Sequence, residues 1–275
     1  MEEIGLLHTE QRNQASTGID RMSTGDMLRV MAEENAKVPS AVEEALPAIE
    51  RAVELLTERM RRGGRMVYVG AGTSGRLGVT DASEIPPTYG VHDKFIGLIA
   101  GGDSAFRNAV EGAEDNSRQG WEDILAFHPT PDDTVVGISA SGGAPYVVGA
   151  LREARAAGLL TGIIACSKGS RAGAVAEVAI EAVVGPEFVT GSTRMKSGTA
   201  TKLILNMIST AVMIRLGHVR GNRMVDMQLT NAKLVDRGTR MIMSETDITD
   251  YDLARELLLK YGSVRAAVER APQDC

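Results

Sequence analysis

Apolar runs and helix-like stretches alternate along the middle of the chain. The apolar runs predict strands at 65–69, 95–100, 133–139, 160–165 and 178–184. Helices are predicted between them at 77–89, 104–117 and 145–157, and a longer apolar helix, suited to burial, is predicted at 195–216. This alternation favours right-handed βαβ units, and therefore a parallel sheet with helices on both faces.

The two ends of the chain differ from this alternating region. Apolar residues at helical spacing predict an amphipathic helix over 41–62, which Pro47 either kinks or starts. Beyond about residue 220 the pattern is helical and more charged, with helix-capping residues at 246–250. We therefore expect an N-terminal arm (1–40), an α/β domain (41–220) and a C-terminal helical module (221–275).

The composition limits which binding partners and which cellular location are expected for the protein. A formal net charge of -6 and a pI of about 5.4 argue against nucleic acid or an anionic membrane as the main partner. The 2 cysteines form no disulfide framework, and the acidic N-terminus lacks the apolar core of a signal peptide, so a cytoplasmic location is expected. The 4 histidines show no metal-ligand spacing, and we expect neither a metal nor a cofactor.

Three loops rich in glycine and hydroxyl groups follow predicted strands, at 72–75, 139–143 and 190–199. In an open α/β sheet, ligands bind beyond the C-terminal ends of the strands. The first loop joins a strand to a helix N-terminus, a combination suited to phosphate. It lacks both the lysine of a P-loop and the glycine spacing of a dinucleotide site. We therefore expect a polyhydroxylated, phosphorylated ligand smaller than a nucleotide.

Three carboxylates lie near predicted strand or helix ends. Glu84 precedes the Pro86–Pro87 break, Glu114 lies in an acidic stretch near the end of a predicted helix, and Glu187 follows Gly185–Pro186 at a strand end. Carboxylates on helices, as predicted for Glu84 and Glu114, are more often simply solvated, whereas Glu187 at its strand end could point into the crevice. No local motif chooses among the three.

Longer motifs make the chain recognisable. Residues 69–78 (VGAGTSGRLG) and 81–90 (DASEIPPTYG) closely resemble the signature of the N-acetylmuramic acid 6-phosphate etherases, as do 98–102, 109–115, 190–200 and 221–227. The resemblance runs from about Thr9 to Thr239, and the chain looks shorter than the family in its C-terminal helical module. One departure is Ile85, where many members have cysteine.

This resemblance implies a sugar-isomerase (SIS) domain, a flavodoxin-like three-layer αβα sandwich that binds phosphosugars. It implies a carbon–oxygen lyase of peptidoglycan recycling that cleaves the D-lactyl ether of N-acetylmuramic acid 6-phosphate, giving N-acetylglucosamine 6-phosphate and D-lactate. Members are typically cytoplasmic homodimers. The two catalytic glutamates of the family fall on Glu84 and Glu114.

The hypothesis for the mechanism is elimination followed by hydration. Ring opening acidifies the C2 proton, Glu114 removes it, Glu84 protonates the departing lactyl oxygen, and water then adds. The division of roles between the two glutamates stays open at this stage. The residues expected to contact the phosphosugar are Gly72, Thr73, Ser74, Gly75, Ser139, Ser141, Glu187, Ser192, Thr193, Arg194 and Lys196, with Arg194 or Lys196 neutralising the phosphate or the lactyl carboxylate.

Two alternatives are kept. The first is a phosphosugar-sensing regulatory protein, because one fold can host both catalysis and sensing, and glucokinase regulatory protein resembles this family. The second is a hexosamine-phosphate isomerase, in which Glu187 would move a proton between C1 and C2. Release of D-lactate without a partner protein would exclude the first, and interconversion of aldose and ketose would reveal the second.

Overall fold

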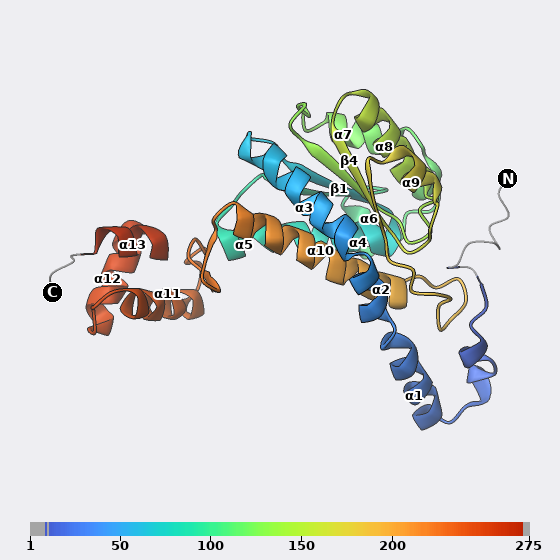
Figure 1. The fold of residues 1–275 in the computed structure, drawn as a ribbon, viewed down its shortest axis with the longest axis horizontal. Coiled ribbons are helices and arrows are strands. Elements are labelled where there is room, and N and C mark those ends of the chain that lie inside the picture. The colour runs from blue at the N-terminus through green and yellow to red at the C-terminus, as the bar shows by residue number, and fades with distance from the viewer. Residues whose placement is uncertain (1–8, 10, 272–275) are drawn as a thin grey trace. The chain divides into compact units, whose positions relative to one another are not determined.

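A parallel sheet forms the centre of the fold (Figure 1). The computed structural model describes residue 9 and residues 11–271. The strands are β1 (Met66–Gly70), β2 (Phe95–Ile99), β3 (Thr134–Ile138), β4 (Leu160–Ala165) and β5 (Val178–Glu181). They pair in parallel in the order β2-β1-β3-β4-β5, which is the flavodoxin-like order of a doubly wound sheet. The predicted fold class is therefore confirmed.

Helices cover both faces of this sheet, as the alternating pattern predicts. On one face, α7 (Gln119–Leu125), α8 (Pro145–Ala156) and α9 (Arg171–Val175) pack on strand residues such as Val67, Val69 and Ile163. On the other face lie α3 (Leu46–Arg61), α4 (Gly72–Ser83) and α10 (Lys196–Arg215). Since successive strand residues point to opposite faces, strands buried on both faces read as continuous apolar runs.

The N-terminal arm is helical, which its polar sequence did not predict. It contains the short turns η3 (Gln14–Ser16) and η4 (Ile19–Arg21), then α1 (Thr24–Asn35) and α2 (Val38–Glu44). Ser23 begins α1 as its N-cap, because the Ser23 hydroxyl accepts a hydrogen bond from the Asp26 N–H at 3.2 Å. Pro47 lies in the first turn of α3, so it starts that helix instead of kinking a longer one.

The predicted helix over 104–117 is wrong. α6 (Ser104–Arg107) ends where Asn108 adopts an extended backbone, and Gly112, at φ 71°, leads into the single 3-10 turn η5 (Ala113–Asp115). A left-handed glycine ends regular helix more readily than it continues one. Glu114 therefore lies in a loop with one helical turn, and not near the end of a long helix.

Two further helix boundaries differ from those predicted. α4 begins at Gly72, earlier than predicted, so that the first hydroxyl-rich loop forms the first turn of the helix. The predicted break near the prolines falls at Glu84, and α5 (Ile85–Tyr89) follows with its prolines in its first turn.

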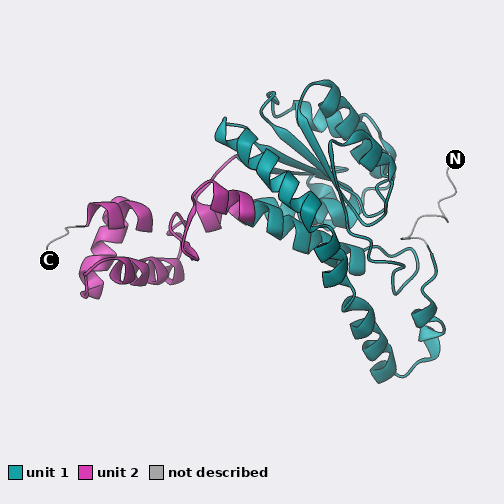
Figure 2. Cartoon of the chain, in the orientation of Figure 1, with its two compact units in different colours: residues 1–82, 94–210 teal, residues 83–93, 211–275 magenta. Residues whose placement is uncertain are grey.

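The chain forms two compact units, residues 1–82 with 94–210, and residues 83–93 with 211–275 (Figure 2). The first contains the sheet. The second has its own apolar core, which includes Ile242, Leu258 and Ala267. It contains the hairpin β6 (Val219–Arg220) and β7 (Arg223–Met224) and the helices α11 (Ala232–Glu245), α12 (Tyr251–Tyr261) and α13 (Val264–Arg270). The domain bounds expected at 40 and 220 stay a prediction.

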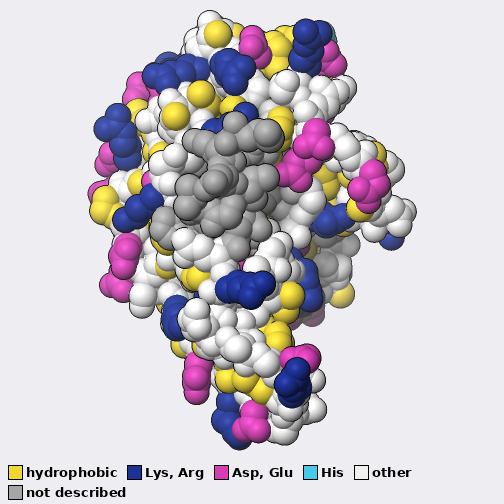
Figure 3. All heavy atoms as spheres, turned by 90° about the vertical axis from the view of Figure 1, so that its right-hand side faces the viewer, with side chains coloured by type: hydrophobic (Ala, Val, Ile, Leu, Met, Phe, Trp, Pro, Cys, Tyr) yellow, Lys and Arg dark blue, Asp and Glu magenta, His cyan; other side chains and the backbone are white. Residues whose placement is uncertain are grey.

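Charges of both signs are interspersed on the face of the molecule drawn in Figure 3, in keeping with the modest net charge of -6. Within 11–271, none of the helices is long and apolar enough to cross a membrane.

A buried ion pair ties the N-terminal arm to the start of α10. Lys196 Nζ lies 2.7 Å from Glu34 Oε2, and the two side chains are 2% and 3% exposed. Glu34 also accepts hydrogen bonds from Asn13 Nδ2 at 2.7 Å and from Lys37. Burial disfavours the charged form of Glu34, but these hydrogen bonds outweigh it and lower the pKa of Glu34 to about 2.

Glu187 completes this buried network. Its carboxylate accepts hydrogen bonds from the backbone N–H groups of Lys196 at 3.0 Å and Ser197 at 2.9 Å. Two of the N–H groups at the N-terminus of α10, which have no acceptor within the helix, are thereby satisfied. A carboxylate there is also favoured by the helix dipole.

We expect Glu34→Gln to lower the free energy of unfolding by about 3 kcal/mol, because it leaves the Lys196 ammonium buried without a counter-charge. The double change Glu34→Leu/Lys196→Met removes both charges and should cost less than either single change. Urea unfolding at pH 7 measures this, with the exposed neighbour Glu33→Gln as the control.

The pH dependence has a defined sign. The folded-state pKa of Glu34 is lowered from 4.5 to about 2, so its stabilising contribution is complete above pH 4.5 and is lost as the pH falls toward 2. Equal stability of Glu34→Gln and the unchanged protein across this range would contradict the role of the pair.

Candidate active site

A cavity of about 210 Å³ lies at the C-terminal ends of β1 and β3, where the sheet order reverses. Its lining residues are Ala71, Gly72, Thr73, Ser74, Glu114, Ile138, Ser139, Ala140, Ser141, Ala144 and Thr193. The structure thus brings parts of all three hydroxyl-rich loops together with one of the two predicted catalytic glutamates. This is the place where doubly wound sheets bind ligands.

The first loop supplies the N-terminal turn of α4. The N–H groups of this turn have no acceptor within the helix and, together with the helix dipole, favour an anion. Gly75 departs from the expectation that its N–H binds phosphate. That N–H donates to Ala71 O at 3.2 Å, and a Cβ at this position would lie only 2.7 Å from Gly70 O. Gly75 therefore lets α4 lie close against β1.

The second loop is a tight turn after β3. Gly142 N–H donates to Ser139 O at 2.9 Å, and Gly142 has a φ of +67°, which glycine adopts without strain. The Ser141 hydroxyl accepts a hydrogen bond from Gly143 N–H at 3.1 Å. Ser139 and Ser141 both line the cavity, with hydroxyl groups of the kind that contact phosphate or sugar oxygens.

The third loop is divided between the cavity and the interior. Thr193 lines the cavity, and its carbonyl accepts a hydrogen bond from Gly198 N–H at 3.1 Å near the start of α10. Ser192 and Arg194 are not among the lining residues, and Arg194 is exposed. The expectation that Lys196 neutralises the ligand is not supported, because its ammonium is buried against Glu34.

The Glu187 side chain likewise lies in the interior of the protein. The residue is fully buried, and both carboxylate oxygens hold the first turn of α10. Glu187 is not among the residues that line the cavity, so this arrangement does not support its expected contact with the phosphosugar. A base that shuttles protons on a ligand must lie within hydrogen-bond reach of it, so this placement also weakens the isomerase alternative.

Glu114 lies where two cavities meet. Besides the first cavity, it lines a second one of about 320 Å³, which also contains Arg76, Glu111 and Asp115. Ala71 and Gly72 line both. Glu114 is exposed as a residue, but partial burial of its carboxyl group, followed by the charge of Asp115, raises the pKa of Glu114. A carboxylate with a raised pKa is a stronger base near neutral pH.

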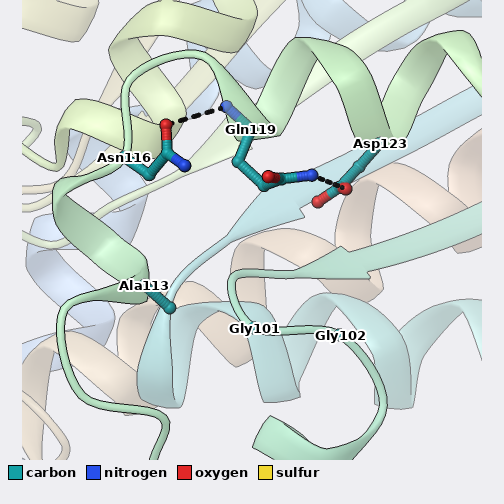
Figure 4. A pocket seen from close by; sticks show the side chains of 6 residues that line it. All are labelled: Gly101, Gly102, Ala113, Asn116, Gln119 and Asp123. Carbon is teal, nitrogen blue, oxygen red and sulfur yellow. Dashed lines mark hydrogen bonds between the residues drawn. The ribbon is translucent and has the colours of Figure 1, made fainter.

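A third cavity, of about 270 Å³, lies along the same segment (Figure 4). It is lined by Gly101, Gly102, Ala113, Asn116, Gln119 and Asp123. The polar groups here already bind one another, since Asp123 accepts hydrogen bonds from Gln119 Nε2 at 2.8 Å and from the Tyr146 hydroxyl at 2.6 Å. Ala113 lines this cavity and also the second one.

Glu84 belongs to the second compact unit. It stands between α4 and α5 with a helical backbone (φ -85°, ψ -11°), and its side chain makes no capping hydrogen bond. Glu84 is exposed, whereas the following residue, Ile85, is buried. At position 85, where this chain has isoleucine and many members of the family have cysteine, the side chain is therefore a packing residue. The Glu84 carboxylate is accessible to solvent.

Within the described residues, no group of three His, Cys, Asp or Glu side chains is arranged to hold a metal ion. Cys166 is buried, and this burial raises the pKa of its thiol to about 12. A thiol in that state is a packing group and not a nucleophile.

Comparison with known proteins identifies the family. Residues 48–155 match the family model of the glucokinase regulatory protein N-terminal SIS domain. A phosphoheptose isomerase structure from Francisella tularensis, 19% identical, covers 69% of this chain and all of its own length (100%) at a TM-score of 0.51, which supports the fold alone.

Curated relatives are much more similar. The N-acetylmuramic acid 6-phosphate etherase of Porphyromonas gingivalis is 60% identical over 93% of this chain and 93% of its own length. That of Bacteroides thetaiotaomicron is 56% identical over 91% of both, and that of Clostridium beijerinckii is 49% identical over 100% of this chain and 95% of its own. The predicted resemblance is confirmed, and this chain belongs to the N-acetylmuramic acid 6-phosphate etherase family.

Proposed function

We propose that this protein cleaves the D-lactyl ether of N-acetylmuramic acid 6-phosphate, giving N-acetylglucosamine 6-phosphate and D-lactate. Relatives named for this activity match the chain at 60% identity over 93% of its length. The observation that carries the proposal is the position of Glu114 in a cavity lined by three hydroxyl-rich loops. A phosphosugar is the small-molecule partner that fits such a site.

The 6-phosphate binds at the N-terminus of α4. Backbone N–H groups of Gly72–Ser74 and the hydroxyls of Thr73 and Ser74 supply donors there. Ser139, Ser141 and Thr193 line the same cavity and take the sugar hydroxyls. Since binding at the phosphate orients the reacting carbons, its free energy contributes to catalysis beyond simple affinity.

Glu114 acts as the base. In the open-chain aldehyde it removes the C2 proton, the electron pair of the C2–H bond forms the C2=C3 double bond, and the C3–O bond breaks. Glu84 gives a proton to the leaving lactyl oxygen. Water then adds at C3, and C2 regains a proton, so the net change is hydrolysis of the ether. The raised pKa of Glu114 brings this carboxyl group closer to the pKa that suits proton transfer near neutral pH.

Glu84 reaches this chemistry from a second copy of the chain. α4 is 12 residues long, and a helix of that length extends about 18 Å. The phosphate donors are in its first turn, whereas Glu84 follows its last residue. One small cavity cannot be lined by both ends of such a helix, so we propose a homodimer in which each site uses Glu114 of one subunit and Glu84 of the other. We also propose a cytoplasmic location.

The regulatory alternative has one supporting observation, the match of residues 48–155 to a glucokinase regulatory protein domain. That match covers the SIS fold but does not account for the identity of 49% to etherases along the whole chain. The isomerase alternative needs a free Glu187, which α10 occupies.

The route is tested with N-acetylmuramic acid 6-phosphate in ¹⁸O-water. Elimination followed by hydration places ¹⁸O on C3 of the sugar product and none in the hydroxyl of D-lactate. Mass spectrometry of both products reads this directly, and Glu114→Gln is expected to release no lactate. Label in the lactate hydroxyl would exclude this route, and no lactate from the unchanged protein would refute the proposed activity.

The shared site is tested by mixing Glu84→Gln and Glu114→Gln subunits. Each homodimer should be inactive, and random mixing should recover about a quarter of the wild-type rate, because half of the dimers carry one intact site of two. A mixture of Glu84→Gln with the double variant is the control and should stay inactive. If proven hetero-oligomers regain no activity, the sites are not shared.

The pH dependence of kcat/KM tests the role of Glu114. Because the charge of Asp115 adds to burial in raising the pKa of Glu114, Asp115→Asn should lower that pKa, keep the base deprotonated in more acidic solution, and move the acidic limb of the pH profile to lower pH. Asp103→Asn, an exposed change on the same segment, should leave the limb in place. A limb that moves upward in Asp115→Asn would contradict the base role.

A further inference from the structure

The segment that carries Glu114 makes few hydrogen bonds to the rest of the protein, although its turn η5 contacts α8. Residues 101–116 join β2 to α7, and three of their glycines, Gly101, Gly102 and Gly112, have positive φ angles. The backbone hydrogen bonds of the segment are local, for example Ala105 N to Gly102 O and Asp115 N to Gly112 O, both within four residues. Such bonds shape the segment but do not connect it to the rest of the protein.

Cavities flank the segment. The cavity with Glu111 and Asp115 is about 320 Å³, and the one drawn in Figure 4 is about 270 Å³. Ala113 lines both of them while also packing against the core. Close packing normally holds a catalytic group in place, and here it acts on only part of the segment.

Arg76 supplies the connection that packing leaves incomplete. Its Nε donates to Phe106 O at 2.8 Å, and its Nη2 donates to Ala105 O at 2.9 Å. Across the part of the chain that the structure describes, the other hydrogen bonds of segment 101–116 stay inside it or reach only the flanking residues 99–119. Arg76 makes no hydrogen bond or ion pair to Glu114 among these contacts.

The location of Arg76 means that this connection joins the cavity-lining helix to the segment that carries Glu114. Arg76 lies in α4, just after the turn that lines the phosphate cavity. The carbonyls it holds are at the end of α6, which precedes Glu114 in the same segment. A guanidinium is a planar fork that can engage two carbonyls at once, whereas a lysine ammonium meets them as a point charge.

We propose that Arg76 is a positioning residue that ties the Glu114 segment to the phosphate-binding helix, so that bound phosphate and base keep a fixed separation. This inference rests on the proposed function. Arg76 acts through the backbone of Ala105 and Phe106. A misplacement of about 1 Å at a reacting group can cost about a hundredfold in rate, which sets the scale of the expected effect.

The test compares Arg76→Lys and Arg76→Gln with the unchanged protein. We expect kcat for D-lactate release to fall about 10-fold to 100-fold in Arg76→Gln, and less in Arg76→Lys. The Kd for N-acetylglucosamine 6-phosphate should change less than about twofold, because the phosphate donors of α4 are untouched. Hydrogen exchange should accelerate within 101–116 and stay unchanged elsewhere in the sheet unit.

Arg107→Gln is the matched control, since Arg107 is an exposed arginine on α6 and should leave kcat, Kd and exchange unaltered. An unchanged kcat in both Arg76 variants overturns the proposal. The proposal is also overturned if kcat stays constant and the loss of kcat/KM is fully matched by weaker binding of the product. In that case Arg76 would be a ligand of the substrate. If the unchanged protein releases no D-lactate, the proposed function fails, and unaccelerated exchange in 101–116 would refute the connection separately.

Discussion

The close approach of α4 to the sheet is the constraint on which the site depends. A side chain at Gly75 would collide with Gly70 O, and one at Gly78 would come within 3.0 Å of the Tyr68 Cβ, so the helix can lie directly on β1 only because both are glycine. Near its other end, Asp81 accepts hydrogen bonds from the Tyr68 hydroxyl at 2.9 Å and from Asn206 Nδ2 at 2.8 Å. Held at both points, α4 aims its free N–H groups at the cavity.

The third loop is fixed by charge instead of close packing. Glu187 satisfies the start of α10, and Glu34 neutralises Lys196, so each buried charged group has hydrogen-bonding partners. A buried pair of this kind is a costly way to gain stability, because desolvation offsets much of the attraction. Its benefit is geometric, since it sets where α10 begins and therefore where Thr193 stands in the cavity wall.

The strands, the sheet class and the three loops could be predicted because each depends on short-range pattern: apolar runs, glycine and hydroxyl content, and their alternation. The helix over 104–117 could not, since its composition allows helix while Gly112 and the contacts of the folded state divide it. The burial of Lys196 and Glu187, which were expected to contact the ligand, could not be predicted either. Glu34, the partner of Lys196, is 162 residues away in sequence, within an arm whose polar pattern gave no sign of a buried acid. Arg76 was visible as part of a motif, but its acceptors are backbone carbonyls, which carry no side-chain signal.

Under the proposed function, these connections make α4 the element through which binding and chemistry are coupled. Its first turn lines the candidate cavity, Arg76 reaches the segment of Glu114, and Glu84 follows its last residue. An ether whose alkoxide leaves poorly needs its acid and base aligned with the C3–O and C2–H bonds at the same time, and remote binding energy can supply that alignment. In a dimer with shared sites, α4 would then fix the position of the base, Glu114, in the site of its own subunit. It would also fix the position of the acid, Glu84, in the site of the partner subunit. Substitutions along α4 should therefore act on kcat more than on phosphosugar affinity, which separates this arrangement from a protein that only senses its ligand.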